Sequence, residues 1–320
     1  MSSTRLKVGI CALFDPGDTP HARTFLRALA TARNVIPALA DVDWHFLDDG
    51  AQAERAAEVA RAMIAWGADI IVGHFSSDAA LGAAPLYRAA GLALLTPAAT
   101  LDRLTQDYHN VFRFCPSDRQ LAKDLMGFIR RQGWQSLQVA ADGSAHGQAL
   151  ARAIAGAATE AGLQLSQDRR QATVEVFAGR LRSSREHWQA RRAAGSSTPL
   201  ILTDDAASPY LGVAQSHDRN TWVIGFGAVG QGGDTCPATL CHRTLFDDLP
   251  QTYYRESLLL FHVLGQLAAR RLRRTRVLDA LNHSTWHTPL GEVGFDQGEC
   301  RGACNRVWQL GPHGLMPIAD

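Results

Sequence analysis

Five short loops carry most of the side chains in this sequence that are suited to binding a small molecule. They are rich in Ser, Thr, Ala, Gly and Asp, and they cover residues 73–77, 96–100, 113–118, 142–147 and 203–205. Ser76 and Ser77 stand at an expected helix start, where the free N–H groups and the helix dipole favour an anion such as a carboxylate. Taken singly, Ser76 or Ser77 is explained by helix capping alone. Five such loops together favour a site that recognises a small polar solute.

The segments that precede these loops are short apolar strands, and segments of helical period alternate with them. Strands are expected at 7–14, 42–47, 69–73, 91–96, 110–114, 136–141, 199–203 and 221–224, and helices at 51–66, 77–89, 118–132, 145–161, 184–194 and 252–273, with another helix opened by Thr19 and Pro20. This alternation predicts an α/β fold with doubly wound parallel sheets, and the number of strands favours two lobes. Ligands bind such sheets outside the carboxyl ends of the strands, where the five loops are expected.

One segment interrupts the alternation. Residues 164–166 and 174–177 have the pattern of successive strands, but only seven residues separate them. A parallel crossover needs a dozen or more. This region has therefore either lost a helix or forms a hairpin.

Composition and charge exclude several classes of function. The 320 residues are 46% hydrophobic and 20% charged, with a formal net charge of +1. This is the balance of a folded globular protein, without the basic excess that binds nucleic acid or an anionic membrane. No apolar run approaches the ~20 residues of a spanning helix, so we expect no membrane insertion. The run at 8–14 is too short for a secretory signal, which predicts a cytoplasmic protein, or a periplasmic one if a signal peptide has been removed.

The loops also form an ordered set of motifs. Gly73-His74-Phe75-Ser76-Ser77, Thr96-Pro97-Ala98-Ala99-Thr100, Leu104-Thr105 and Arg113-x-Cys115-Pro116-Ser117-Asp118 together resemble the branched-chain amino acid-binding proteins of the type I periplasmic binding protein fold. The resemblance is close over residues 47–162 and looser over 7–47 and 192–320. It implies two doubly wound parallel-sheet lobes, the second one shortened, joined by hinge strands and closing on a free amino acid. The implied lobes are residues 1–117 with 247–290, and 118–246 with 291–320.

The resemblance also implies a role for each loop in binding a zwitterion. Ser77 and the backbone of Thr100 would hold the ligand α-carboxylate, while the Ala98 carbonyl and the Thr100 hydroxyl would take the α-ammonium. Asp118 and Asp204 stand at acidic positions of the family, and Asp204 lies where Glu or Asp pairs with the ammonium. The complete set of expected ligand-binding residues is Ser76, Ser77, Ala98, Ala99, Thr100, Asp118, His146, Arg180 and Asp204.

Two positions depart from the family pattern. His146 stands where the family has Tyr, and Arg180 stands where another aromatic residue is common. If both face the ligand, they favour a polar or acidic ligand side chain, bound more tightly as the pH falls through the ordinary His pKa near 6.5. The alternative is that the shortened segment leaves Arg180 in solvent.

The cysteines bear on location and on metal binding. The two positions of the family's first-lobe disulfide are here Ala51 and Ser76, and the loss of that bridge fits a reducing compartment. Cys236, Cys241, Cys300 and Cys304, with His242, invite comparison with a zinc site, but their spacings are not the usual Cys-x2-Cys. We expect two local disulfides or plain buried thiols instead, and no metal.

Two further motifs have simpler explanations than the functions they suggest. Residues 225–230 match G-x-G-x-x-G after a strand, but no helix can start at the following residues 231–237, so we expect a Gly-rich turn and no cofactor. The Arg-rich residues 270–274 suit a solvated helix end, with a partner-docking patch as the alternative.

These observations predict a non-catalytic protein that binds an amino acid-like or amide solute, similar to the substrate-binding component of an ABC transporter, with a permease as partner. The alternative is a cytoplasmic ligand sensor similar to the aliphatic amidase regulator, with a regulatory protein as partner. A third possibility is an enzyme that uses His146, Asp118 and Asp204 as acid–base groups. The sequence has no recognisable nucleophile for it.

Overall fold

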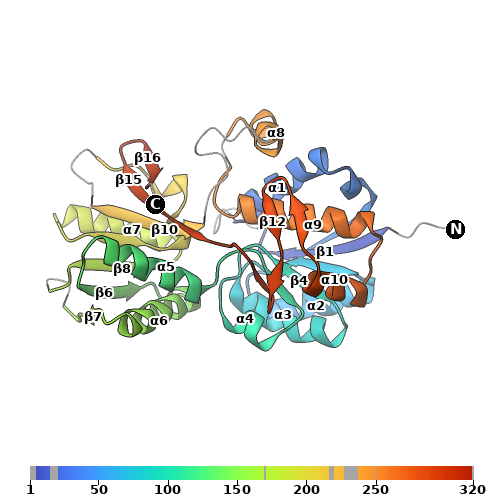
Figure 1. Cartoon of the computed structure of the whole chain (residues 1–320), viewed down its shortest axis with the longest axis horizontal. Coiled ribbons are helices and arrows are strands. Elements are labelled where there is room, and N and C mark those ends of the chain that lie inside the picture. Colours follow the sequence, from blue (N-terminus) through green and yellow to red (C-terminus); the bar gives the residue numbers. More distant parts are fainter. Residues whose placement is uncertain are drawn as a thin grey trace. The chain divides into compact units, whose positions relative to one another are not determined.

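The computed structural model describes residues 5–14, 21–168, 171–215, 220–226, 237–248 and 250–318 (Figure 1). The chain divides into two compact units. The first comprises Met1–Pro116 and Ala228–Ala303, and the second comprises Ser117–Gly227 and Cys304–Asp320. Neither unit is continuous in sequence, so each depends on segments that are far apart along the chain.

The described part of the first unit contains a seven-stranded sheet of order β13-β14-β5-β4-β3-β1-β2. Its strands are β1 (Leu6–Ala12), β2 (Val42–Asp48), β3 (Ile70–Gly73), β4 (Ala93–Thr96), β5 (Val111–Arg113), β13 (Phe295–Asp296) and β14 (Glu299–Cys300). Strands β1 to β5 are mutually parallel, and β14 pairs in parallel with β5. The carboxyl ends of β3, β4 and β5 therefore meet at one edge.

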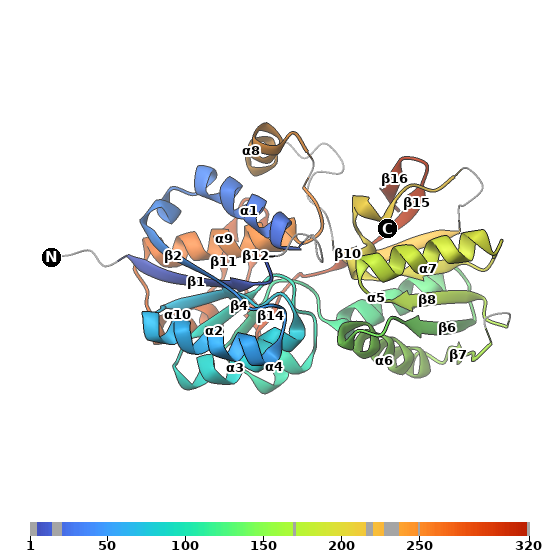
Figure 2. The same cartoon turned by 180° about the vertical axis from the view of Figure 1, so that it is seen from behind.

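Helices cover both faces of this sheet, with α1 and α9 on one face and α2 and α3 on the other (Figures 1 and 2). The helical segments of this unit are α1 (His21–Val35), η1 (Pro37–Asp41), α2 (Ala53–Trp66), α3 (Ser77–Ala89), α4 (Arg103–Asp107), α8 (Pro237–Phe246), α9 (Tyr254–Ala269) and α10 (Thr275–His283). Strands β11 (Trp286–Thr288) and β12 (Gly291–Val293) form an antiparallel pair. Small residues bring α2 and α3 together: a Cβ on Gly82 would lie 2.3 Å from the Ala53 carbonyl oxygen.

The described part of the second unit also contains a seven-stranded sheet, of order β16-β15-β10-β9-β8-β6-β7. Its strands are β6 (Ser136–Ala141), β7 (Gln164–Leu165), β8 (Val174–Ala178), β9 (Leu200–Leu202), β10 (Thr221–Phe226), β15 (Asn305–Gly311) and β16 (Gly314–Pro317). Strands β6 to β10 are parallel, whereas β15 and β16 are antiparallel additions. The helical segments are α5 (Asp118–Arg131), α6 (Ala145–Glu160), α7 (Leu181–Ala193), η2 (Asp204–Ala206) and η3 (Pro209–Leu211).

Strand β8 shows why helices are needed on both faces of the second sheet. Val174 and Val176 belong to the apolar cluster formed with α5 and α6. Glu175 and Phe177, which alternate with them, contact His187 of α7. Because successive side chains of a strand point to opposite faces, α7 covers the face opposite to α5 and α6.

The expected α/β architecture is confirmed. The structure also decides between the two alternatives for residues 164–177, and it shortens the helix expected at 252–273. Strands β7 and β8 lie on either side of β6, both parallel to it, so the region around them has lost a helix and forms no hairpin. The helix expected at 252–273 ends at Ala269, because the chain takes a left-handed conformation at Arg271 (φ +53°). The helix start at Thr19 and Pro20 lies outside the described residues.

The division of the chain differs from the expected ranges 118–246 and 291–320 for the second lobe. Helix α8 packs on α1 of the first unit. Strands β13 and β14 extend the first sheet, since Glu299 pairs with Arg113 of β5. Residues 237–246 and 291–303 are therefore grouped with the first unit.

Candidate functional site

In the first unit, the loop after β3 places Ser76 and Ser77 at the start of α3. The chain turns sharply at Gly73 (φ +126°), where a Cβ would lie 2.0 Å from the Cys11 carbonyl oxygen, so only glycine fits. Ser76 occupies the N-cap position without a side-chain capping bond, so capping does not account for its hydroxyl. The Ser77 hydroxyl accepts a hydrogen bond from the Leu101 N–H at 3.4 Å.

A buried chain of hydrogen bonds fixes the start of this loop. His74, itself in a left-handed conformation (φ +45°), contacts Asp49 through Nδ1 at 2.8 Å and the Tyr87 hydroxyl through Nε2 at 3.0 Å. The Tyr87 hydroxyl lies 3.7 Å from the Cys11 sulfur, and burial raises the pKa of that thiol. All four side chains are buried, which makes them a rigid support for the loop.

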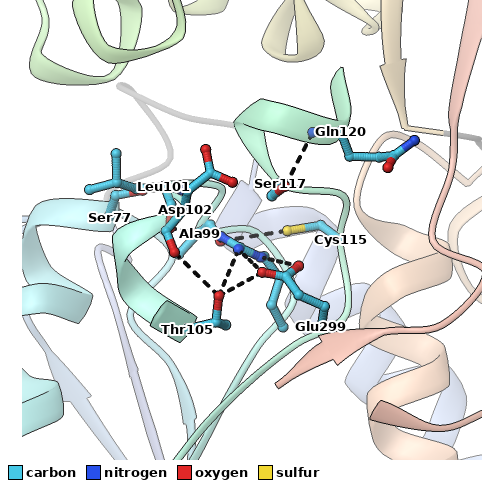
Figure 3. Close-up of polar contacts among 10 residues, drawn as sticks. Ser77, Ala99, Leu101, Asp102, Thr105, Cys115, Ser117, Gln120 and Glu299 are labelled. Atoms are coloured by element: carbon cyan, nitrogen blue, oxygen red, sulfur yellow. Dashed lines mark hydrogen bonds and ion pairs between the residues drawn. The ribbon is translucent and has the colours of Figure 1, made fainter. Parts of the chain in front are cut away.

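The loop after β4 is buried and held from two sides. The N–H groups of Ala98 and Ala99 donate to Thr96 Oγ1, at 3.4 and 3.1 Å. The guanidinium of Arg113 donates to the carbonyl oxygens of Ala99 and Leu101, at 3.2 and 2.9 Å (Figure 3). Thr100, a buried residue of this loop, lies between these two carbonyls in sequence. Arg113 belongs to one of the sequence motifs, but no role was predicted for it.

In the second unit, the expected residues gather at the carboxyl edge of the sheet. His146 lies in the first turn of α6 after β6, Arg180 directly precedes α7 after β8, and Asp204 begins η2 after β9. Strands β6, β8 and β9 are parallel, so these three positions share one edge. Asp118 is the first residue of α5 and is buried.

Asp204 and His146 form an ion pair at this edge of the second unit's sheet. His146 Nε2 lies 3.4 Å from Asp204 Oδ1, and their side chains are 19% and 0% exposed. Neither Asp204 oxygen, nor His146 Nε2, has a hydrogen-bond partner among the described residues. Burial by itself lowers the pKa of His146, but the Asp204, Asp205 and Asp118 carboxylates outweigh it and raise that pKa to about 10. His146 is therefore a cation at neutral pH.

Asp142 joins two loops of this edge, a role that the sequence analysis missed. Its Oδ1 accepts from the Ser144 N–H and hydroxyl, at 3.0 and 2.5 Å, and its Oδ2 accepts from the Arg180 N–H and the Ser183 hydroxyl, at 2.8 and 2.6 Å. Burial raises the pKa of Asp142, yet these hydrogen bonds outweigh it and the net shift is downward. A Cβ on Gly147 would lie 2.3 Å from Oδ1. The signal in the sequence is the Asp-Gly-Ser run directly after a strand.

Arg180 does not form a buried positive charge. Its backbone N–H is held by Asp142, and its residue is exposed. This agrees with the solvent-exposed alternative for Arg180. The cation beside the carboxylates of this edge is His146, which is partly buried.

The cysteines of the described residues form no disulfide bonds. Cys300 and Cys304 are unpaired, which rules out the local disulfide considered for them, and Cys304 is exposed rather than buried. Burial raises the pKa of Cys300 to about 12. Within the described ranges, no group of three or more His, Cys, Asp or Glu residues is placed to hold a metal ion. Residues 227–236 lie outside the described residues. They include Cys236 and the last four residues of the Gly-rich motif at 225–230.

Comparisons with known proteins agree with this architecture. Residues 40–178 match the family model described as periplasmic binding protein. An ABC transporter substrate-binding protein from Desulfitobacterium hafniense in complex with Leu is 19% identical, with a TM-score of 0.81 over 98% of this chain and 99% of that one. The leucine binding protein LivK from Thermotoga maritima is 17% identical, with a TM-score of 0.85 over 98% of each chain.

A solute-binding protein of an ABC transporter from R. palustris, in complex with benzoate, is 13% identical, with a TM-score of 0.80 over 98% of this chain and 96% of that one. No curated protein matches the sequence. The chain thus has the type I periplasmic binding protein fold, as the motifs predicted.

These comparisons also bear on the class of protein and on its location. The similar structures are of binding proteins and not of enzymes. They give no support to the expected cytoplasmic location and are consistent with the periplasmic alternative. None of the described helices is long and apolar enough to cross a membrane.

Proposed function

We propose that this protein is a non-catalytic binding protein for a small amino acid-like solute and serves as the substrate-binding component of an ABC transporter. In this proposal the two units close on one solute, and each contributes part of its site. The fold and the family-model match over residues 40–178 support the class of protein.

The buried carboxylate of Asp204 is the observation that favours one class of ligand over another. It is fully buried, lacks a hydrogen bond from the described residues, and has one cation, His146, at 3.4 Å. Burying an ionised carboxylate without hydrogen bonds is costly, so such a group favours a ligand that supplies N–H donors. A ligand ammonium is such a donor, with three N–H bonds and a positive charge.

The first unit supplies the complementary half. The Ser76 and Ser77 hydroxyls, the N–H groups at the start of α3 and the Thr100 backbone suit a ligand carboxylate, whereas the N–H groups of Ala98 and Ala99 already donate to Thr96. We therefore propose Ser76, Ser77 and the Thr100 backbone as the carboxylate side of the site, with Ala99 as a neighbouring backbone contact. The Ala98 carbonyl and the Thr100 hydroxyl would accept from the ligand ammonium. Asp118 and Asp204 are the carboxylates of the ammonium side. We propose that His146, the cation paired with Asp204, contacts the ligand side chain, and that the exposed Arg180 lies at the periphery of the site.

This assignment distinguishes amino acids from aromatic acids, the two kinds of ligand found in the similar structures. Benzoate has a carboxylate but no N–H donor, so it would leave the Asp204 oxygens without a hydrogen bond from the ligand. We therefore favour a ligand that carries both groups.

Calorimetric titration of the purified chain with L-leucine, L-glutamate, L-glutamine and benzoate tests the proposal. At least one amino acid should bind more tightly than benzoate, and Asp204→Asn should weaken its binding by tenfold or more, a cost of about 1.4 kcal/mol per factor of ten. The matched control is Asp205→Asn, which removes a charge from the same turn and should change affinity by roughly threefold or less. Equal binding by wild type and Asp204→Asn would reject the role of Asp204, and binding of benzoate alone would reject the ligand class.

The role in transport is tested separately. A transporter component that captures solute outside the cytoplasm should appear in the extracytoplasmic fraction of cells that express the full gene. Recovery in the cytoplasmic fraction would contradict the transport role and would leave the ligand assignment in place.

A further inference from the structure

Arg113 in the first unit donates hydrogen bonds to the loop that contains Thr100. Arg113, at the end of β5, is fully buried. A guanidinium has five N–H groups. Here it donates through Nε to Glu299 at 3.1 Å, through Nη1 to Ala99 and Leu101, and through Nη2 to Thr105 Oγ1 at 3.1 Å and to the second Glu299 oxygen. Five acceptors thus match five donors.

The two backbone acceptors, Ala99 and Leu101, show which part of the proposed site Arg113 holds in place. The carbonyl oxygens of Ala99 and Leu101 flank Thr100, so their bonds to one rigid, planar group fix the peptide planes on both sides of it. The Leu101 N–H in turn donates to the Ser77 hydroxyl. In Figure 3 the labelled residues Ala99, Leu101, Thr105 and Glu299 lie close together, and the Cys115 side chain is directed at the Ala99 carbonyl. One side chain thereby connects the two loops of the proposed carboxylate side.

The same hydrogen-bond network includes Glu299, which is distant from Arg113 in sequence. Glu299 lies on β14 and pairs in register with Arg113. Thr105 Oγ1 donates to Glu299 at 2.6 Å, so the carboxylate accepts hydrogen bonds from Thr105 and from Arg113. Strands β5 and β14 immediately precede two points, Pro116 and Ala303, at which the chain leaves the first unit. The network therefore joins the Thr100 loop to both of these strands.

Stabilisation of the fold does not by itself explain why an arginine occupies position 113. The Arg113 side chain is 0% exposed and the Glu299 side chain is 31% exposed, so the guanidinium loses its hydration while the carboxylate keeps part of it. An ion pair with a desolvated arginine is often no more stabilising than apolar side chains of the same volume. What an arginine supplies and an apolar side chain does not is a fixed set of donor directions.

We propose that Arg113 is a positioning residue of the ligand site, which sets the Thr100 backbone and the Ser77 hydroxyl for a ligand carboxylate without touching the ligand. The inference rests on the proposed function for its ligand, but the arrangement of the loop is tested without one. Lysine in its place keeps the charge but offers three donors at a single nitrogen, too few and too close together for two carbonyls, Thr105 and Glu299.

The experiment compares Arg113→Lys with Arg191→Lys in the full chain. Arg191 is the matched control: it is buried in the second unit, pairs with Glu175, and donates to the Thr198 carbonyl at 2.7 Å. Hydrogen–deuterium exchange of peptides that cover residues 97–103 is measured without ligand. Affinity is then measured for whichever of L-leucine, L-glutamate, L-glutamine and benzoate the wild type binds.

Both variants should lower the melting temperature. Only Arg113→Lys should raise exchange at residues 97–103, by about tenfold or more, and weaken ligand binding tenfold or more. Arg191→Lys should leave both within about twofold of wild type. Glu299→Gln, which keeps the shape and removes the charge, provides a milder variant that should show the same pattern if Arg113→Lys does not fold.

Unchanged exchange at 97–103 in both Arg113→Lys and Glu299→Gln would overturn the proposal. Raised exchange with unchanged affinity would also overturn it, because the loop order would then not serve binding. If the wild type binds none of the probes, the proposed function fails, while the exchange result still decides whether Arg113 orders the loop.

Discussion

His146 is the residue whose behaviour depends most on the fold. An isolated His titrates near pH 6.5, and the sequence suggested that ligand binding would tighten through that pH. In the structure the carboxylates around it, Asp204 first, raise its pKa to about 10 against the opposing effect of burial. His146 then stays charged across the neutral range, so that expectation is wrong and no change of affinity near pH 6.5 is expected from it.

The same pKa shift predicts a pH-dependent stability. A group whose pKa is raised on folding stabilises the native state fully below its unfolded pKa, and that contribution is lost as pH rises through the folded value. The difference in free energy of unfolding between wild type and His146→Gln should be constant below about pH 6.5 and shrink as the pH approaches 10. Urea unfolding from pH 6 to 10 measures it. A difference that grows towards pH 10 would contradict the assignment of the His146–Asp204 pair.

At the scale of elements, the close approach of α2 and α3 gives a prediction with an internal control. Gly82→Ala in α3 would bring a Cβ within 2.3 Å of the Ala53 carbonyl oxygen, a backbone atom that cannot turn aside. We expect a loss of about 1–3 kcal/mol, the usual cost of overpacking. Gly156→Ala in α6 meets nothing within 4 Å and should instead gain roughly 0.5–1 kcal/mol through helix propensity. Thermal unfolding of both variants tests whether the two changes in stability have opposite signs. Two variants of equal stability would contradict the packing argument.

The elements were more predictable than the contacts that join them. Helix α3 and strand β6 have their expected bounds, because a small polar loop before an apolar helical period, and a short apolar run between turns, are local signals. The role of Arg113 was not predictable in the same way. Its position between Phe112 and Phe114 hinted at burial, but its partner Glu299 is distant in sequence and joins it only through strand pairing. The His146–Asp204 pair likewise needed the parallel order of β6, β8 and β9.

At the scale of the whole molecule, the last strands of the chain complete a unit that begins at Ser117. Strand β15 pairs antiparallel with β10 from Trp222 to Phe226, and it buries Trp308 and Leu310. Strand β16 is a partly exposed edge, and within the described part of the chain it pairs with β15 alone. The second unit therefore depends on β15 far more than on β16.

Two truncations separate these contributions. Removal of residues 312–320 takes β16 and leaves β15, whereas removal of 304–320 takes both. Because β10 then loses its antiparallel neighbour and the cover of two buried apolar side chains, hydrogen exchange in β9 and β10 should rise by tenfold or more in the longer truncation and by much less in the shorter one. Strands β1, β3 and β4 belong to the other unit and should keep their protection in both. A uniform rise across both sheets would instead mean that the two units unfold as one, and that the last strands stabilise the entire chain.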